Sequence, residues 1–300
     1  MLRAGTCSAN GLPNHNDLDG GTFVFEAGGQ RWGMDMGSDN YGLKNYFSQS
    51  LRFRYGYYRK ATAGHNTLTF DNDGIDNINR GACDQDPGAN GITAITLFAG
   101  SDTISPDHDG PGGVGSSSPA YSIVDLTAAY GPQNSSRIER GFAFTESYKH
   151  LLIVDEFEFA AGSTVRNVTW TMHTMATIQL PTAATSGGGG GGGDVGSAVL
   201  SLGGVTLHAT VIEPAGAMFS AAAVDLQPPQ KPSVGVSKLQ VHLNLGSAVV
   251  AAAADGAVAP RVAAPVARIV VGLSLSAAPA AVAPSLLAQW EAAGPFAGGS

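Results

Sequence analysis

Short runs in which apolar and polar residues alternate recur along the chain, and turn-forming residues separate them. Examples are TFVFE at residues 22–26 and NTLTF at residues 66–70, in a sequence with 41 glycines and 16 prolines among 300 residues. Alternation with period two is typical of strands that bury one face, and glycine and proline favour the turns between them. We therefore expect an all-β fold, a large antiparallel β-sandwich of two packed sheets.

The predicted strands divide the chain into four parts. Beyond the two runs above, they are Gln30–Met36, Ile92–Phe98, Tyr121–Thr127, Arg137–Thr145, His150–Phe159, Arg166–Met172, Val205–Ile212, Lys238–Leu245 and Val262–Ser276. Residues 1–180 are expected to form the main sandwich with the site motifs, and residues 198–276 to supply its remaining strands. Residues 181–197 form a flexible insertion, because consecutive glycines at 187–193 would lose much backbone entropy in a packed element. Residues 277–300 are a loose tail or carry a short helix around Ser285–Ala292.

The charge of the chain argues against nucleic-acid binding. The formal net charge is −8 and the 16 lysines and arginines are scattered, whereas coating a duplex needs clustered cations. No stretch reaches the roughly 20 apolar residues of a membrane span, and no signal peptide is visible at the N-terminus. The two cysteines, Cys7 and Cys83, leave both their pairing and the compartment open.

Carboxylates and imidazoles gather near the ends of three predicted strands. The stretch NHNDLDGGTF places His15, Asp17 and Asp19 just before a strand, Asp35 lies near the end of the next strand, and His65 begins a third. A hairpin between the first two strands would bring Asp35 back beside the residues that open it. Mixed nitrogen and oxygen ligands of this kind predict a divalent metal site of the zinc type. From the residues alone, an Asx-rich turn and a buried, hydrogen-bonded histidine are the alternatives.

Basic and aromatic residues are interleaved in RFRYGYYRK at residues 52–60. One interpretation is an exposed strand whose long side chains pack on aromatic rings. The other is a sugar-binding strip in which Arg54, Tyr57 and Arg59 contact pyranose rings and their carboxylates or sulfates. His173, in WTMHTMATI, is expected to be a core or rim residue of a strand.

The order of these motifs closely resembles the heparinase II/III-like family, which comprises polysaccharide lyases and their relatives. The resemblance rests on NHNDLDGGTFVFEAGGQRWGMDMGSDNYGLKNYF followed by YYRKATAGHNTLTF, and extends through DLTAAY and LLIVDEF. It implies that the chain is the C-terminal β-sandwich portion of such a protein, without the α/α toroid that precedes the sandwich in the family. It also implies cleavage of acidic, uronate-containing polysaccharide by β-elimination.

The same resemblance implies roles for individual residues. His15 aligns with a histidine that faces the substrate cleft, where it would act as base or hold the sugar carboxylate. Asp17 falls where several relatives carry a zinc-binding histidine, and Asp35 and His65 align with the remaining zinc ligands. Tyr46 lies near the position of a cleft-lining tyrosine. Zinc is therefore the expected cofactor.

The expected partners are an acidic polysaccharide, of the glycosaminoglycan or alginate type, and a helical toroid domain; a homodimer is a further option. Secretion or a periplasm-like compartment is expected from the resemblance alone. Two other functions stay open at this point. One is a non-catalytic carbohydrate-binding or scaffold domain, and the other is uronate C5 epimerisation, which begins with the same proton abstraction as β-elimination.

Overall fold

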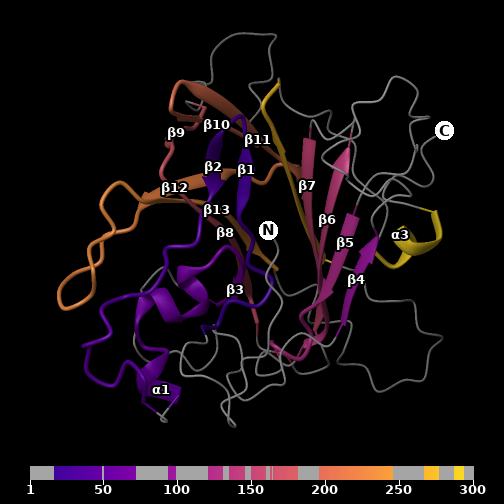
Figure 1. The fold of residues 1–300 in the computed structure, drawn as a ribbon. Helices are drawn as coiled ribbons and strands as arrows, with labels where there is room; N and C mark the ends of the chain where they lie inside the picture. The colour runs from indigo at the N-terminus through magenta and orange to yellow at the C-terminus, as the bar shows by residue number, and fades with distance from the viewer. Residues whose placement is uncertain are drawn as a thin grey trace, which may run out of the picture.

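The computed structural model describes residues 17–48, 51–71, 94–98, 121–130, 135–145, 150–159, 163, 165–181, 196–245, 267–276 and 287–293 (Figure 1). The strands are β1 Phe25–Ala27, β2 Gln30–Gly33, β3 Leu68–Phe70, β4 Ala94–Phe98, β5 Tyr121–Asp125, β6 Ser135–Thr145, β7 His150–Phe159, β8 Asn167–Thr174, β9 Thr177–Gln179, β10 Ser197–Leu202, β11 Val205–Glu213, β12 Phe219–Ala223, β13 Ser237–Asn244 and β14 Ala267–Ser274. The helical elements are α1 Leu51–Arg54, η1 Tyr58–Lys60, η2 Thr62–Gly64 and α3 Leu287–Ala293.

The strands form two sheets and one separate hairpin. The larger sheet has eight strands in the order β4-β5-β6-β7-β14-β11-β10-β9, and the smaller has four in the order β12-β13-β8-β3. β1 and β2 pair only with each other. Every pairing among the described strands is antiparallel. This arrangement confirms the predicted all-β sandwich of antiparallel sheets.

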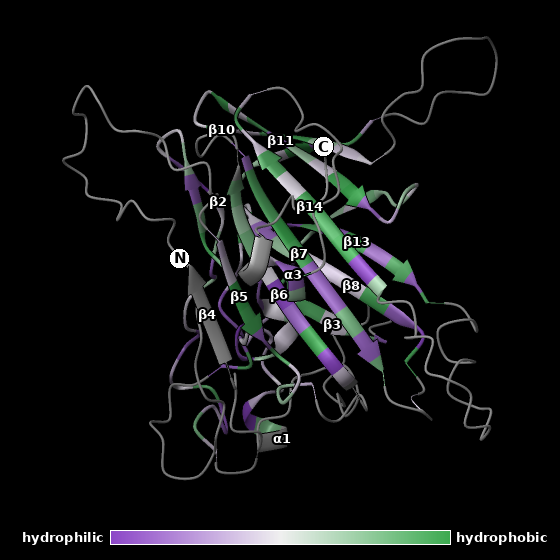
Figure 2. Ribbon diagram, turned by 90° about the vertical axis from the view of Figure 1, so that its right-hand side faces the viewer, coloured by the Kyte–Doolittle hydropathy of each residue, from purple (hydrophilic) through white to green (hydrophobic). Residues whose placement is uncertain are grey.

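The main hydrophobic core lies between the two sheets. Its buried members include Leu68, Trp170 and Leu239 from the four-stranded sheet and Ile138, Ile153 and Val271 from the eight-stranded sheet. β7, β11 and β14 in the larger sheet each contain a hydrophobic stretch (Figure 2). Alternate residues of these strands point inward, as the period-two pattern requires.

The outer face of the eight-stranded sheet is covered in part by α3. Leu287 and Trp290 pack against Leu152, Val154 and Val270 there. Gly141 makes this approach possible, because a Cβ atom at that position would clash with Leu287 and lie 3.0 Å from the Trp290 ring. A short helix in this region was one of the two predictions for the tail, and it is confirmed. No helix among the described residues is long and apolar enough to cross a bilayer.

Most predicted strands form within a few residues of their expected bounds, and His150–Phe159 matches them fully. Three strands were not predicted: β9, β10 and β12. The prediction of an exposed strand over residues 52–60 is wrong, since this stretch contains α1 and η1. The glycine run at 187–193 lies outside the described residues.

Candidate functional site

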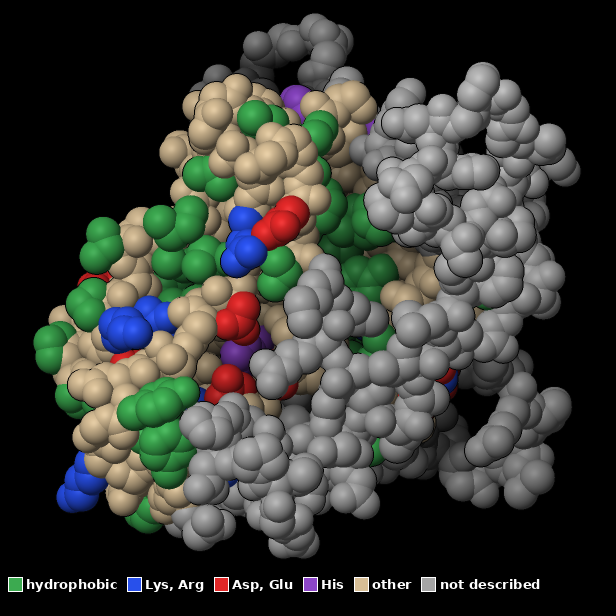
Figure 3. Space-filling model, in the orientation of Figure 1, with side chains coloured by type: hydrophobic (Ala, Val, Ile, Leu, Met, Phe, Trp, Pro, Cys, Tyr) green, Lys and Arg blue, Asp and Glu red, His purple; other side chains and the backbone are tan. Residues whose placement is uncertain are grey.

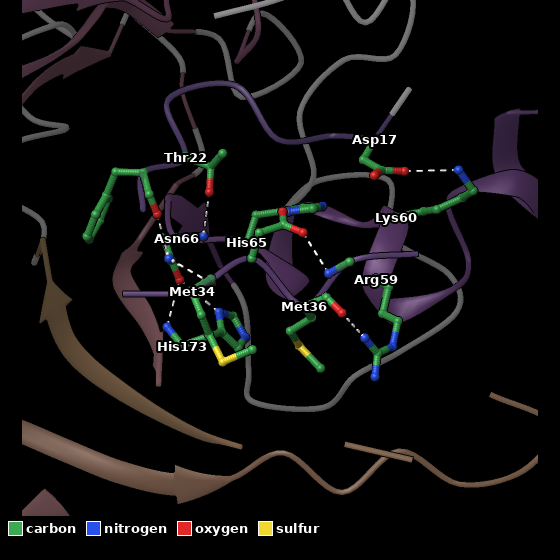
Figure 4. A network of polar contacts seen from close by, with 12 residues as sticks. Asp17, Thr22, Met34, Met36, Arg59, Lys60, His65, Asn66 and His173 are labelled. Atoms are coloured by element: carbon green, nitrogen blue, oxygen red, sulfur yellow. Dashed lines mark hydrogen bonds and ion pairs between the residues drawn. The ribbon is translucent and has the colours of Figure 1, made fainter. Parts of the chain in front are cut away.

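Three segments of the first 70 residues meet beside β8 of the four-stranded sheet. They are residues 17–23, which precede β1, residues 34–40, which follow β2, and residues 58–67, which contain η1 and η2 (Figure 4). Backbone hydrogen bonds join them to one another and to the sheet: Leu18 N donates to Lys60 O at 2.9 Å, and Met34 N donates to His173 O at 2.9 Å. The side chains at the ends of β2 and before β3 therefore converge.

Asp35 and His65 face each other at this junction. The Oδ2 atom of Asp35 lies 3.5 Å from Nδ1 of His65; the His65 side chain is 3 % exposed and that of Asp35 is 38 % exposed. Among the described residues, no hydrogen-bond partner lies close enough to either ring nitrogen of His65. Asp35 is held by its other oxygen, which accepts the N–H of Gly37 at 2.6 Å. The structure therefore brings Asp35 and His65 side by side, and their role as metal ligands stays a prediction.

The electrostatic surroundings of His65 favour positive charge. Burial of the ring lowers its pKa, but the contact with Asp35 and the negative charges of Asp19 and Asp17 outweigh burial, so the pKa of His65 is raised. Figure 3 shows acidic side chains around a histidine on this face of the molecule. These surroundings thus favour the protonated, positively charged form of the His65 imidazole.

Asp17 has a different principal partner. Its Oδ1 atom accepts a hydrogen bond from the Lys60 ammonium at 2.9 Å, and the Lys60 side chain is only 2 % exposed. The ammonium also lies 4.4 Å from the centre of the Tyr46 ring, within the range of a cation–π interaction. The Lys60 charge therefore has an anion on one side and an aromatic face on another.

Tyr46 is buried beside these charges. Its hydroxyl oxygen accepts the backbone N–H of Asp39 at 3.0 Å. Burial raises the pKa of Tyr46, and the negative charges of Asp17 and Asp39 add to this effect. The phenol therefore keeps its proton at neutral pH.

The three predicted sugar-binding residues differ in their exposure to solvent and in their hydrogen-bond partners. Arg59 is buried, with its guanidinium donating to the backbone carbonyls of Met36 and Pro232. Arg54 is also buried, and its guanidinium lies 5.4 Å from the centre of the Tyr55 ring. Tyr57 is partly exposed and donates its hydroxyl proton to the carbonyl of Lys44. His15 lies outside the described residues.

The residues present fit a zinc ion in part. Asp35 and His65 supply an oxygen and an imidazole side by side, and the buried ring nitrogens of His65 lack hydrogen-bond partners among the described residues. Asp17, the third predicted ligand, is bound to Lys60. Within the described ranges, no three histidine, cysteine or acidic side chains are grouped closely enough to hold a metal ion.

A second polar cluster, which sequence reasoning missed, lies behind His65. The Asn66 side chain accepts hydrogen bonds from the backbone N–H of His173 at 2.6 Å and from its Nδ1 at 3.1 Å. The Nε2 atom of His173 lies 2.8 Å from the Tyr58 hydroxyl. All three side chains are buried. Nothing local in the sequence marks them, because Tyr58, Asn66 and His173 meet only through the tertiary fold.

Comparisons with known proteins agree with this architecture. The sequence profile described as "Heparinase II/III-like, C-terminal" matches residues 1–193. A solved heparinase III structure superposes with a TM-score of 0.50 at 13 % identity, covering 91 % of this chain and 31 % of that one. Heparan sulfate lyase HepC from Pedobacter heparinus gives a TM-score of 0.49 at 10 % identity, covering 86 % of this chain and 30 % of that one. No curated protein sequence matches the chain significantly.

The chain therefore spans about a third of the length of these solved structures. The profile match covers well over half of the chain and includes every segment that meets at the candidate site. The sandwich fold, the order of the site motifs and the profile match together show that this chain belongs to the heparinase II/III-like family and corresponds to its C-terminal β-sandwich domain.

Proposed function

We propose that the chain is the β-sandwich portion of a polysaccharide lyase that also contains a helical toroid domain. The proposed lyase cleaves uronate-containing polysaccharide by β-elimination. The observation that carries the proposal is the pair formed by His65 and Asp35, 3.5 Å apart in a buried acidic setting that raises the pKa of the imidazole. Such a pair holds positive charge where the family motifs converge.

Positive charge is what β-elimination needs beside the sugar. A base removes the proton at C5, the electrons of that bond form the C4–C5 double bond, and the bond to O4 breaks. An acid then protonates O4, so no water is consumed. Negative charge builds on the uronate carboxylate as the C5 proton leaves, and a fixed cation nearby lowers the barrier.

The roles of two further residues follow from the same scheme. Tyr46 is proposed as the acid on the resemblance, and the Asp39 N–H that its oxygen accepts would stabilise the phenolate left after proton transfer. His15 is proposed as the base or as a holder of the sugar carboxylate, on the resemblance alone. Tyr57, whose ring is partly exposed, is the residue of the predicted sugar-binding strip with surface to offer a pyranose.

We include zinc in the proposal, held by Asp35 and His65, with Asp17 as a ligand only if it leaves Lys60. When bound, zinc would supply a fixed positive charge that neutralises the surrounding carboxylates. Elemental analysis of the purified chain tests this: we expect stoichiometric zinc in the wild type and its loss in both Asp35→Ala and His65→Ala. A zinc-free wild type purified without chelators would contradict it.

The lyase activity is tested on the full-length gene product with a panel of glycosaminoglycans and alginates. Cleavage creates an unsaturated uronate, whose conjugated double bond absorbs in the ultraviolet. We expect absorbance to grow with at least one polymer, and to be lost in His65→Ala but kept in Lys44→Gln, an exposed change on the neighbouring loop. No absorbance across the panel would contradict the proposal.

A non-catalytic carbohydrate-binding domain is a second candidate. It is supported by Tyr41, which is 53 % exposed and whose ring centre lies 5.7 Å from that of Tyr46, because such rings stack on pyranose faces. Titration calorimetry with uronate oligosaccharides separates the two candidates: binding without cleavage, reduced by Tyr41→Ala, would favour this one.

Sedimentation velocity of the same sample tests whether the chain forms a homodimer.

A further inference from the structure

Asn66 connects every segment that builds the candidate site. Its side-chain nitrogen donates to the carbonyls of Phe23 at 2.8 Å and Met34 at 3.0 Å. Its side-chain oxygen accepts two hydrogen bonds from His173 on β8. Its backbone nitrogen donates to the Thr22 hydroxyl at 3.0 Å. The amide is fully buried and uses both of its donor hydrogens and both acceptor positions (Figure 4).

These partners are the immediate neighbours of the site residues. Met34 directly precedes Asp35, and Asn66 itself directly follows His65. The donor that Asn66 gives to Met34 therefore ties the backbone that carries Asp35 to the backbone that carries His65. A shift of either segment would leave a buried hydrogen-bonding group without its partner, which destabilises that arrangement.

The eight-stranded sheet also contacts the backbone of Asn66, through an ion pair between two of its strands. Arg140 on β6 and Asp155 on β7 lie directly opposite each other in the sheet. Nε and one terminal nitrogen of Arg140 bind the Asp155 carboxylate at 2.7 and 3.0 Å. The other terminal nitrogen donates to the carbonyls of Gly21 at 2.9 Å and Asn66 at 2.7 Å.

Burying this ion pair removes two charges from water, and that desolvation opposes the stabilisation that the pair provides. Both side chains have no exposed area, so their charges have lost all contact with water. Apolar residues of similar volume often stabilise a fold as well as a buried ion pair does. What only the planar guanidinium provides is a fork that reaches one carboxylate and two carbonyls in fixed directions. Those carbonyls belong to the segments that precede β1 and follow His65.

We propose that Asn66, held by Arg140 from the eight-stranded sheet, is a positioning residue that sets the placement of His65 against Asp35. This inference rests on the proposed function, since it gives these two side chains their importance. Asn66 does not touch the reacting atoms in this scheme and acts through its two neighbours. Arg140 supports it through the Asn66 carbonyl.

The test compares three variants with one matched control in the full chain. Asn66→Ala removes the whole amide, Asn66→Asp keeps its size but loses both donors, and Arg140→Lys keeps the buried charge but loses the fork. Val270→Ala is the control, because it creates a cavity beneath α3 on the far face of the sheet. Urea unfolding identifies conditions in which each protein is folded.

Two readouts are measured under those conditions. The first is the long-range proton–nitrogen NMR spectrum of the His65 imidazole at one fixed pH, which reports the contact of Nδ1 with Asp35 without any metal. The second is zinc affinity by chelator competition. We expect all three variants to alter the His65 signals and to weaken zinc binding by about tenfold or more, while Val270→Ala changes neither.

Unaltered His65 signals in folded Asn66→Asp and Arg140→Lys would overturn the proposal, as would equal changes in Val270→Ala. A wild type that binds no zinc would refute the proposed zinc site, but the NMR comparison would still test the positioning role. Should Asn66→Ala not fold, the other two variants decide the matter by the same criteria.

Discussion

The Tyr58 hydroxyl donates a hydrogen bond to Nε2 of His173, with 2.8 Å between the oxygen and the nitrogen, and both side chains are buried. The direction of this hydrogen bond follows from Asn66. Its amide nitrogen faces two backbone carbonyls and its oxygen faces the backbone N–H of His173, so the amide has only one allowed orientation. The Asn66 oxygen must then accept from Nδ1 of His173, which leaves Nε2 as the acceptor for Tyr58.

A neutral, buried His173 makes stability depend on pH. Burial lowers the pKa of His173 from 6.5 to about 3, and the positive charges of His65 and Lys238 act in the same direction. The folded state therefore binds a proton less readily than the unfolded state, and the contribution of His173 is lost as pH falls below 6.5. We expect it to account for about 2 kcal/mol of lost stability between pH 7 and pH 5.

Urea unfolding of the wild type and His173→Gln at pH 7 and pH 5 checks this expectation. Glutamine has no titrating group but still offers a donor and an acceptor, so the variant is expected to lose less stability on acidification. Equal losses in the two proteins would mean that His173 is not the titrating group.

Gly64 is required by the tight turn that delivers His65. A Cβ atom at residue 64 would clash with the Tyr58 carbonyl oxygen and lie 2.9 Å from its carbon, both of them backbone atoms that cannot rotate away. Gly64→Ala is therefore expected to destabilise the fold by about 2 kcal/mol or more, as overpacking does. Gly42→Ala is the control, because its nearest neighbour is the end of the Asn40 side chain at 3.3 Å. Similar unfolding free energies for the two variants would contradict this account of η1 and η2.

Trp290 anchors α3 to the outer face of the eight-stranded sheet. Its ring is buried, and its centre lies 5.5 Å from that of Tyr121 in an edge-on arrangement. Trp290→Ala is expected to cost about 3 kcal/mol of stability, the usual scale for removing a buried tryptophan. Gln289→Ala, at an exposed position on the same helix, should cost less than about 0.5 kcal/mol. Chemical denaturation measures both, and equal costs would mean that the helix does not dock in solution.

The sandwich could be predicted because burial on one face imposes period two on the sequence. β11 shows this clearly: Leu207, Ala209 and Val211 belong to the core between the sheets, and polar residues separate them along the strand. β12 was missed because its sequence, FSAAA, is mostly alanine, which has little preference for strands. Residues 52–60 gave the opposite error. Their aromatic residues favoured a strand, but the stretch contains α1 and η1.

The candidate site was predictable only where the motif itself fixes the geometry. Asp35 and His65 meet because a hairpin and a turn, both marked by glycine, return the chain to one place. The Asp17–Lys60 ion pair was not predictable, because Lys60 faces Asp17 only as a result of η1. Arg140 was missed for a similar reason: its partners Gly21 and Asn66 are more than 70 residues away along the chain. Whether zinc binds at the site stays a prediction.

Lys60 offers a direct test of how charge is divided at the site. Its ammonium neutralises Asp17, so Asp17 would contribute less to binding of the proposed zinc ion than its position suggests. Lys60→Met removes that positive charge from among Asp17, Asp19 and Asp35, and we expect zinc affinity to rise by about tenfold, the effect of one unit charge at close range. Stability should fall at the same time, because the ion pair between Asp17 and the buried Lys60 is lost. Chelator competition measures the affinity, and Lys44→Gln, an exposed change on the neighbouring loop, should leave it unchanged. An affinity that falls in Lys60→Met would show instead that the lysine holds Asp17 in place as a ligand.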